Sequence, residues 1–225
     1  MKGEAFIVES TALASPPLLP EIRLHLATEV TPLWHATEAH LARAQIEPPF
    51  WAFAWAGGQA LARHLLDHVE LVRGRRVLDF ASGSGLVAIA AALAGAAEVI
   101  AVELDPLAVT AIGLNARASG VRVDARLADV IESEPEWLAD REVILAGDVC
   151  YDRAMTDRVR PWLAARARAG ALTLLGDPGR AYLDPSDLVE LARHVVPTID
   201  DVEGQREKTG VVFRVRGGSS GGSGR

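Results

Sequence analysis

Acidic residues stand directly after the short apolar runs of this 225-residue chain, at positions where a carboxylate could bind a cation. They are Asp79, Glu103, Asp105, Asp129 and Asp148. If the apolar runs are parallel strands, their carboxyl ends meet at one edge of a sheet, where open α/β sheets bind ligands. Solvated loop acids are the simpler explanation, but the recurrence of acids at successive run ends favours a binding crevice. A crevice lined by carboxylates suits a cationic cofactor and a cationic acceptor group.

A glycine-rich turn, ASGSG over residues 81–85, follows the first of these acids. The turn fits the G-x-G-x-x-A pattern of nucleotide-binding βαβ units, and Glu103 stands roughly where such units place a ribose-binding acid. Gly83 and Gly85 let the backbone approach a ligand without a Cβ clash. The pattern by itself therefore allows NAD or FAD.

Asp79 decides between the possible nucleotides. It stands four residues before Gly83, at the carboxyl end of a predicted strand and beside the ligand crevice. A pyrophosphate would bring two negative charges there, and like charges about 4 Å apart cost roughly 4 kcal/mol at an effective dielectric constant of about 20. S-adenosylmethionine has no phosphate and carries a sulfonium and an ammonium group, which a carboxylate attracts. We therefore predict that the cofactor is S-adenosylmethionine and that the product is S-adenosylhomocysteine.

Other residues near the predicted crevice can then be given roles. Glu103 can accept hydrogen bonds from both ribose hydroxyls, and Leu104 beside it offers an apolar face to adenine. Asp129, after the third predicted strand, can accept from the adenine amino group. An indole close to the sulfonium would be favourable, and Trp55 is the candidate. Its aromatic neighbours at 50, 51 and 53 are expected to serve core or lid packing.

The elements that must position these residues alternate between strand and helix from residue 75 onward. Strands are predicted at 76–80, 98–103, 121–127, 142–147 and 171–176, and helices at 85–95, 106–118, 153–168 and 185–195. This alternation predicts an α/β fold with a mostly parallel sheet and helices on both faces. Two further strands at 197–203 and 210–215 read as a hairpin, so the last strand is expected to be antiparallel.

The N-terminal part of the chain is less regular. Residues 1–19 are expected to be extended, followed by a short helix opened by Pro20, a helix around His35–Gln45 and a helix over Gln59–Val69. The predicted division is an N-terminal extension with helices at 1–70, a Rossmann-like core at 71–216 and a flexible Gly/Ser tail at 217–225, interpreted as an added linker.

Composition narrows the class of protein. A formal net charge of −7 and an isoelectric point near 5.4 argue against general nucleic-acid binding. Cys150 is the only cysteine, so we expect a buried small hydrophobic residue rather than a disulfide or a zinc site. His64 and His68 have a metal-pair spacing without a third ligand, so no metal is predicted.

No apolar run is long enough to span a membrane, and neither a secretory signal nor a transit peptide is evident. We expect a cytoplasmic monomer.

Asp79, Gly83, Gly85 and Glu103 together resemble the class I, seven-strand methyltransferases that use S-adenosylmethionine. Three further segments, at 49–61, 147–152 and 176–180, resemble the lysine methyltransferases of the electron transfer flavoprotein β-subunit, as does Leu19–Leu24. The W-x-G-G-Q sequence ending at Gln59 and the D-x-x-Y pattern of Asp148 and Tyr151 are the specific parts of this likeness. One departure is Phe80-Ala81-Ser82, where many members have glycine before the serine.

The resemblance implies a seven-strand Rossmann-like sheet and a protein-lysine N-methyltransferase. It implies cofactor contacts at Trp55, Asp79, Gly83, Gly85, Glu103 and Asp129. Asp148 and Tyr151 would line the channel for the acceptor lysine. The expected substrate is a protein with an exposed lysine, such as the flavoprotein β-subunit, and in some bacterial relatives a ribosomal stalk protein. Bacterial origin is expected, because the presequence of the mitochondrial animal relatives is missing.

Alternative interpretations stay open at this point. Asp148 could cap a helix that starts nearby, although the pairing with Tyr151 favours a role in methyl transfer. A methyltransferase of the same fold could act on a small amine. A non-catalytic Rossmann-like binding module or an NAD enzyme is the third possibility.

Overall fold

The computed structural model describes residues 2–27, 49–198 and 205–217. A seven-stranded sheet runs through the described part, in the spatial order β5-β4-β3-β6-β7-β9-β8. Its strands are β3 (Arg76–Phe80), β4 (Glu98–Glu103), β5 (Asp124–Leu127), β6 (Val143–Gly147), β7 (Leu172–Asp177), β8 (Leu188–Pro197) and β9 (Glu207–Val215). Strands β3 to β7 pair in parallel, and β9 is antiparallel to both of its neighbours. The predicted α/β class and the antiparallel last strand are confirmed.

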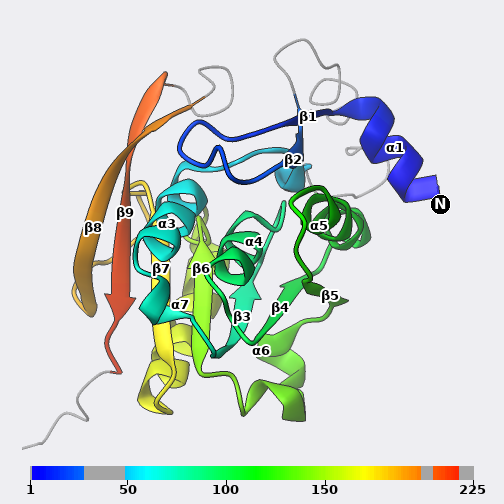
Figure 1. Ribbon diagram of the computed structural model, residues 1–225. Coiled ribbons are helices and arrows are strands. Elements are labelled where there is room, and N and C mark those ends of the chain that lie inside the picture. The colour runs from blue at the N-terminus through cyan, green and yellow to red at the C-terminus, as the bar shows by residue number, and fades with distance from the viewer. Residues whose placement is uncertain (1, 28–48, 199–204, 218–225) are drawn as a thin grey trace, which may run out of the picture.

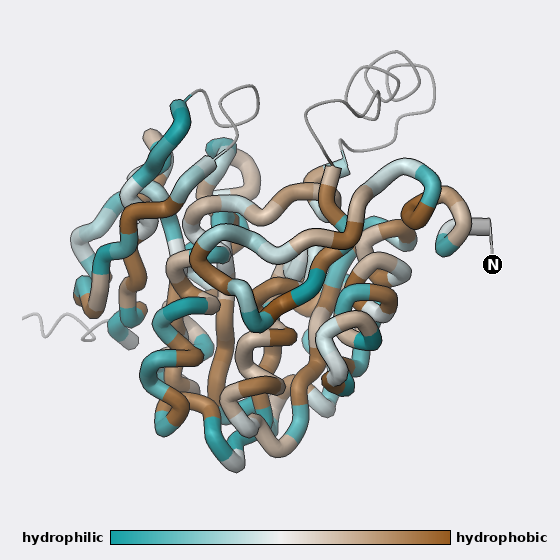
Figure 2. The backbone as a smooth tube through the Cα atoms, turned by 45° about the horizontal axis from the view of Figure 1, so that its top comes forward, coloured by the Kyte–Doolittle hydropathy of each residue, from teal (hydrophilic) through white to brown (hydrophobic). Residues whose placement is uncertain are grey.

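Helices cover both faces of this sheet (Figure 1). They are α3 (Ala56–Asp67), α4 (Leu86–Leu93), α5 (Pro106–Ala118), α6 (Val130–Ser133) and α7 (Arg153–Arg168). Alternate strand residues serve the two faces: Val77 belongs to the core with α3, α4 and α5, whereas Leu78 belongs to the core with α6 and α7. Figure 2 shows the hydrophobic segments running through the middle of the molecule. Within the described residues, no helix is long and apolar enough to cross a membrane.

Local sequence explains the helices that were predicted with the correct bounds. Helix α5 begins at Pro106 because the Asp105 carboxylate accepts from the Leu107 N–H at 2.7 Å, and proline suits the first helical position. Helix α7 begins at Arg153, where the Asp152 carboxylate accepts from the Met155 N–H at 2.8 Å. Strand β5 is shorter than predicted and starts at Asp124.

The predicted helix at 185–195 is wrong, because this segment forms the edge strand β8. Its apolar residues are spaced ambiguously, and pairing with β9 over Leu188 to Pro197 supplies the backbone hydrogen bonds that a helix would have made internally. The first strand of the predicted hairpin, 197–203, is correspondingly misplaced: β8 ends at Pro197, and 199–204 lie outside the described residues.

The N-terminal predictions also need correction. Lys2–Ser10 is a helix, α1, rather than extended chain, and its Ile7 is fully buried in a small core that includes Ala111 of α5. The predicted helix after Pro20 is a turn leading into β2 (Leu24–Leu26), which pairs with β1 (Ala12–Ala14). The helix predicted around residues 35–45 lies outside the described residues. Helix α3 starts three residues before the predicted Gln59.

Candidate active site

The turn after β3 is arranged around the buried Asp79 carboxylate. It accepts hydrogen bonds from the Ser82 hydroxyl and from the Ala88 N–H, the latter at 3.0 Å. Gly83 and Gly85 have positive φ angles of 55° and 83°, which glycine adopts without strain, and a Cβ on Gly85 would lie 3.2 Å from Ile112 of α5. A Cβ added to Gly83 would meet no other atom within 4 Å, which leaves its backbone open to a ligand.

Burial raises the pKa of Asp79 to about 7, against the lowering effect of its two hydrogen bonds. The charge of Glu103 adds to this rise. A carboxylate that is costly to ionise in the ligand-free protein gains most from a cationic ligand, because the ligand compensates the lost hydration. The burial of Asp79 therefore fits a cofactor that brings positive charge.

Glu103, at the end of β4, ties the glycine turn to the neighbouring strand. Its Oε1 accepts from the Gly83 N–H at 2.6 Å and its Oε2 accepts from the Leu104 N–H at 3.0 Å. Each carboxylate oxygen has a further lone pair, so hydrogen bonds from ribose hydroxyls remain possible. The Leu104 side chain is 62% exposed beside it, as a residue that contacts an adenine ring would need to be before the ligand binds. Burial raises the pKa of Glu103.

The two other acids at this end of the sheet cap helices. Asp105 caps α5 as described above, and Asp129 accepts from the N–H groups of Ile131 and Glu132 at the start of α6. The second carboxylate oxygen of Asp129 pairs with Arg158 at 2.9 Å. Asp129 nevertheless lies next to the cofactor turn, because the adjoining Ala128 N–H donates to the Glu103 carbonyl at 3.0 Å.

Asp148 follows β6 directly and does not cap α7, the next helix along the chain. Its backbone has a φ of +57°, and its side chain is buried. Oδ2 accepts from the Gly58 N–H at 2.7 Å, and Oδ1 accepts from Nε and Nη2 of Arg180 at 3.2 and 2.7 Å. Since Asp152 caps α7, the capping interpretation of Asp148 is wrong. Burial raises the pKa of Asp148 to about 6, and Arg180 opposes that rise.

The start of α3 contacts Asp148 closely, and this contact explains the adjacent glycines of the W-x-G-G-Q sequence. A Cβ on Gly57 would lie 2.5 Å from the Gly176 carbonyl oxygen and 2.7 Å from Asp148 Oδ2. The neighbouring Gly58 supplies the N–H that the carboxylate accepts. The glycines thus allow a helix terminus to reach a buried carboxylate.

Aromatic side chains before α3 and in the loop after β6 contact one another. The Trp55 ring lies 6.0 Å from the Phe50 ring, and the Phe50 ring lies 5.5 Å from the Tyr151 ring. Trp55 Nε1 donates to the Phe50 carbonyl at 2.9 Å. Tyr151 is 42% exposed, so it can contact an incoming substrate. Trp51 and Phe53 are buried in the core, as predicted.

The cofactor turn and the Asp148 group lie at the same edge of the sheet because their strands are neighbours. Phe80, at the end of β3, is paired with Ala146 near the end of β6. The chain order reverses at these two strands, since β4 and β5 lie on one side of β3 and β6 and β7 on the other. Such a switch point is where open α/β sheets bind ligands.

The comparisons with known proteins find methyltransferases of two names. The family model described as "Ribosomal protein L11 methyltransferase (PrmA)" matches residues 58–147. The electron transfer flavoprotein beta subunit lysine methyltransferase of Xenopus laevis is 38% identical over 199 residues, which are 86% of this chain and 76% of that protein. Its counterpart from Rattus norvegicus is 37% identical over 206 residues, 88% of this chain and 78% of that protein. This chain belongs to the electron transfer flavoprotein beta subunit lysine methyltransferase family.

Solved structures support the fold of this family member. The ribosomal protein L11 methylase of Lactobacillus delbrueckii subsp. bulgaricus superposes with a TM-score of 0.51 at 18% identity, covering 73% of this chain and 81% of that one. A putative RNA methyltransferase from Pyrococcus horikoshii gives a TM-score of 0.54 at 16% identity, covering 80% and 99%. The fold is that of the class I methyltransferases.

Membership in the family also settles which cofactor is used. The chain is an S-adenosylmethionine-dependent methyltransferase, and the glycine turn is not that of an NAD or FAD enzyme. The residues fit this cofactor, because the open backbone at Gly83, the Glu103 carboxylate and the exposed Leu104 lie together at the ends of β3 and β4.

Asp177 and Arg180, from the segment at 176–180 that resembles the family, join the Asp148 group. Asp177, fully buried at the end of β7, accepts from the N–H groups of Gly179 and Arg180 through Oδ1, at 2.8 and 2.7 Å. Arg180 in turn binds Asp148 and lies over the Trp55 ring at 5.7 Å. The G-D-P-G-R sequence at 176–180 was the available signal, but its partner lies 32 residues earlier in the chain.

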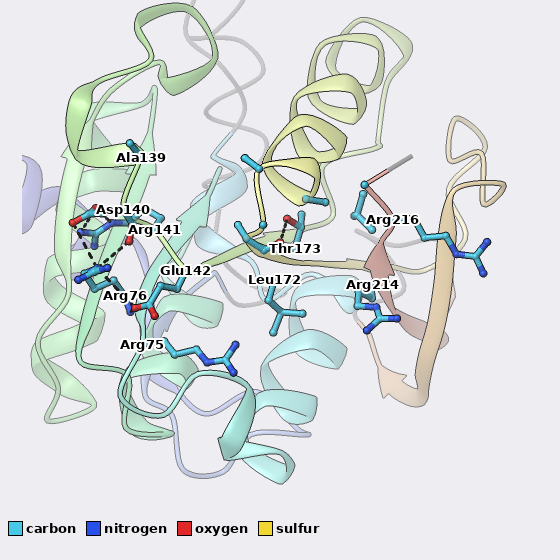
Figure 3. A pocket seen from close by; sticks show the side chains of 16 residues that line it. Arg75, Arg76, Ala139, Asp140, Arg141, Glu142, Leu172, Thr173, Arg214 and Arg216 are labelled. Atoms are coloured by element: carbon cyan, nitrogen blue, oxygen red, sulfur yellow. Dashed lines mark hydrogen bonds and ion pairs between the residues drawn. The ribbon is translucent and has the colours of Figure 1, made fainter. Parts of the chain in front are cut away.

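Other features of the described residues lie outside this site. Cys150 is buried, as predicted, and burial raises the pKa of its thiol to about 11. No group of three possible metal ligands occurs in the described ranges. A groove of about 800 Å³ lies at the other end of the parallel strands, by the starts of β6 and β7 and the end of β9 (Figure 3). It is lined by arginines such as Arg75 and Arg214 and contains none of the predicted site residues.

Proposed function

We propose that this enzyme transfers a methyl group from S-adenosylmethionine to a lysine ε-amine of a protein substrate. The β-subunit of the electron transfer flavoprotein is the first candidate, and a ribosomal stalk protein is the second. The observation that carries the proposal is that the buried Asp148 carboxylate lies at the same end of the sheet as the cofactor turn, with the Phe50 and Tyr151 rings close in sequence or space. The names of the relatives, which specify lysine, support the choice of acceptor.

The cofactor end is assigned first. Asp79 compensates the positive charge of the cofactor, and the backbone at Gly83 and Gly85 lies against its methionine part. Glu103 holds the ribose hydroxyls and Leu104 contacts adenine. Asp129 accepts from the adenine amino group, in the same segment that bonds to the end of β4.

At the acceptor end, Asp148 and Tyr151 line the lysine channel, and Trp55 contacts the sulfonium of the cofactor. The cofactor supplies an electrophilic methyl group on sulfur, so the protein mainly aligns the amine and controls charge. A lysine amine has a pKa near 10.4, so presenting it unprotonated at pH 7 costs about 4–5 kcal/mol. An isolated carboxylate would favour the ammonium form. Asp148 therefore acts by orienting the amine rather than by its charge alone.

Replacement of Asp148 by Ala tests this assignment. We expect methyl transfer to a protein acceptor to be lost, while binding of S-adenosylhomocysteine, measured by calorimetry, stays within about twofold of the original. The acceptors to test are purified flavoprotein β-subunit and ribosomal stalk protein, with intact mass as the readout. Unchanged turnover in the Ala variant would refute the role of Asp148.

A small amine is the alternative to a protein acceptor, because the same cofactor turn and Asp148 carboxylate would serve either. Incubating a cell lysate with cofactor labelled in its methyl group separates the two, because a labelled protein band requires a protein acceptor. Label confined to small molecules would favour the small amine.

A further inference from the structure

The guanidinium group of Arg180 is bound to Asp148, the carboxylate of the proposed acceptor site. It binds Asp148 through two nitrogens and lies over the face of Trp55 at 5.7 Å. The backbone that carries it is fixed, because Asp177 accepts from the Arg180 N–H and Gly179 takes a positive φ of 82°. The Arg180 side chain is half-buried, so its charge is partly shielded from water.

We propose that Arg180 is a positioning residue that stays on Asp148 during the reaction and admits the acceptor nitrogen in its uncharged form. This inference rests on the proposed lysine methylation. With Arg180 in place, the charges of the carboxylate and the guanidinium cancel. The pair therefore gives an ammonium group no net attraction, whereas a neutral amine can still donate to the remaining lone pairs of Asp148.

The hydrogen bonds of Asp148 are consistent with this role of Arg180. Oδ2 is held by the Gly58 N–H and Oδ1 by Arg180, so the orientation of the carboxylate is set before a substrate arrives. Without Arg180, the ionised form of the same carboxylate would have no cationic partner and would stabilise the ammonium form of the lysine. The lysine proton passes to solvent before transfer. The nitrogen lone pair then forms the N–C bond as the C–S bond breaks, leaving S-adenosylhomocysteine and a methylated ammonium.

Other ionisable groups around Asp148 do not replace this effect. Asp177 adds negative charge from the end of β7, and Arg160 of α7 pairs with Asp187. The thiol of Cys150 stays protonated, since burial raises its pKa. Tyr151 contributes a phenol from the loop after β6. Arg180 is the charged group that contacts the Asp148 carboxylate among the described residues.

The test compares Arg180→Gln, which removes the charge, with Arg180→Lys, which keeps it. We expect the ascending limb of kcat against pH, which reports the ionisation of groups in the enzyme–substrate complex, to move upward by about one pH unit in Arg180→Gln, with about a tenfold loss at pH 7.5. Arg180→Lys should keep the limb near its original position. The matched control is Arg214→Gln, an exposed arginine in the groove at the other end of the parallel strands, which should leave the profile unchanged.

A second acceptor separates an effect on the lysine from an effect on Asp148 itself. A peptide or protein in which sulfur replaces one methylene of the lysine has an amine of lower pKa. If Arg180 acts by excluding the ammonium form, this acceptor should recover most of the activity lost in Arg180→Gln. If the loss came from protonation of Asp148, the two acceptors would lose activity equally, and the proposal would be overturned.

Three further outcomes are decisive. A higher KM with an unmoved pH limb would mean that Arg180 only shapes the site, and a faster reaction would mean that it blocks the site; either overturns the proposal. Should Arg180→Gln not fold, as judged by binding of S-adenosylhomocysteine, Arg180→Met removes the same charge while keeping an apolar side chain over Trp55. If the unaltered enzyme methylates no protein lysine, the proposed function fails instead.

Discussion

Replacement of Asp79 by Asn should stabilise the ligand-free protein while abolishing its affinity for the cofactor. Burial raises the pKa of Asp79 from its ordinary value of 3.8 to about 7. Each pH unit between the folded and unfolded pKa values corresponds to about 1.4 kcal/mol, so the ionised carboxylate costs the folded state about 4 kcal/mol. Asparagine keeps an oxygen for the Ser82 and Ala88 donors but never ionises.

The sign of the pH dependence follows from the raised pKa. Between about pH 4 and 7 the folded protein binds more protons at Asp79 than the unfolded chain does, so the stability falls as the pH rises. The penalty is complete above about pH 7. Urea unfolding at pH 5 and pH 8 should therefore show a gain for Asp79→Asn that is larger by 2 kcal/mol or more at pH 8.

Two outcomes would refute this reasoning. One is an equal free energy of unfolding for the two proteins at pH 8; the other is the same gain at both pH values, which would point to packing rather than ionisation. Calorimetry with S-adenosylhomocysteine supplies the functional half of the test. If the variant binds the ligand as tightly as the original protein, Asp79 does not compensate a ligand charge.

The remaining predictions concern backbone geometry. Gly57→Ala should destabilise the fold by about 1–3 kcal/mol and lower turnover, because its Cβ would collide with the Gly176 carbonyl and with Asp148. The matched control is Gly58→Ala, whose Cβ would meet other atoms only at 3.9 Å; equal losses of stability in the two variants would contradict the steric argument. Ala81 has a φ of +50°, which costs an alanine about 1–2 kcal/mol, so Ala81→Gly should stabilise the protein by up to about 1 kcal/mol after the greater entropy of the unfolded chain is deducted. A loss of more than about 1 kcal/mol in denaturant unfolding would show that this strain is not present.

The left-handed conformation of Ala81 also explains the departure noted in the sequence. Many class members have glycine at this position, and the structure shows a backbone conformation that glycine adopts without cost. The turn keeps its shape because Asp79 and Glu103 hold it from both sides. Surrounding hydrogen bonds therefore maintain a conformation that the local sequence disfavours.

The sequence by itself determined the central elements and the cofactor. Strands β3, β4, β6 and β7 each contain a short apolar run, and α5 and α7 begin at aspartate caps, so local chemistry specifies them. The cofactor followed from charge, because Asp79 precedes the glycine turn by a fixed number of residues. These features depend on neighbours within about thirty residues along the chain.

Only the tertiary structure decided the rest. Strand β8 is a strand because β9 lies beside it, and α1 is held by packing on α5, neither of which is visible in the local residue pattern. The same holds for the acceptor end, where residues 58, 148 and 180 meet although they are far apart in sequence. A sequence places an acid at the end of a strand, but whether that acid caps a helix, as Asp129 does, or pairs with a distant arginine, as Asp148 does, depends on which segments the fold brings against it.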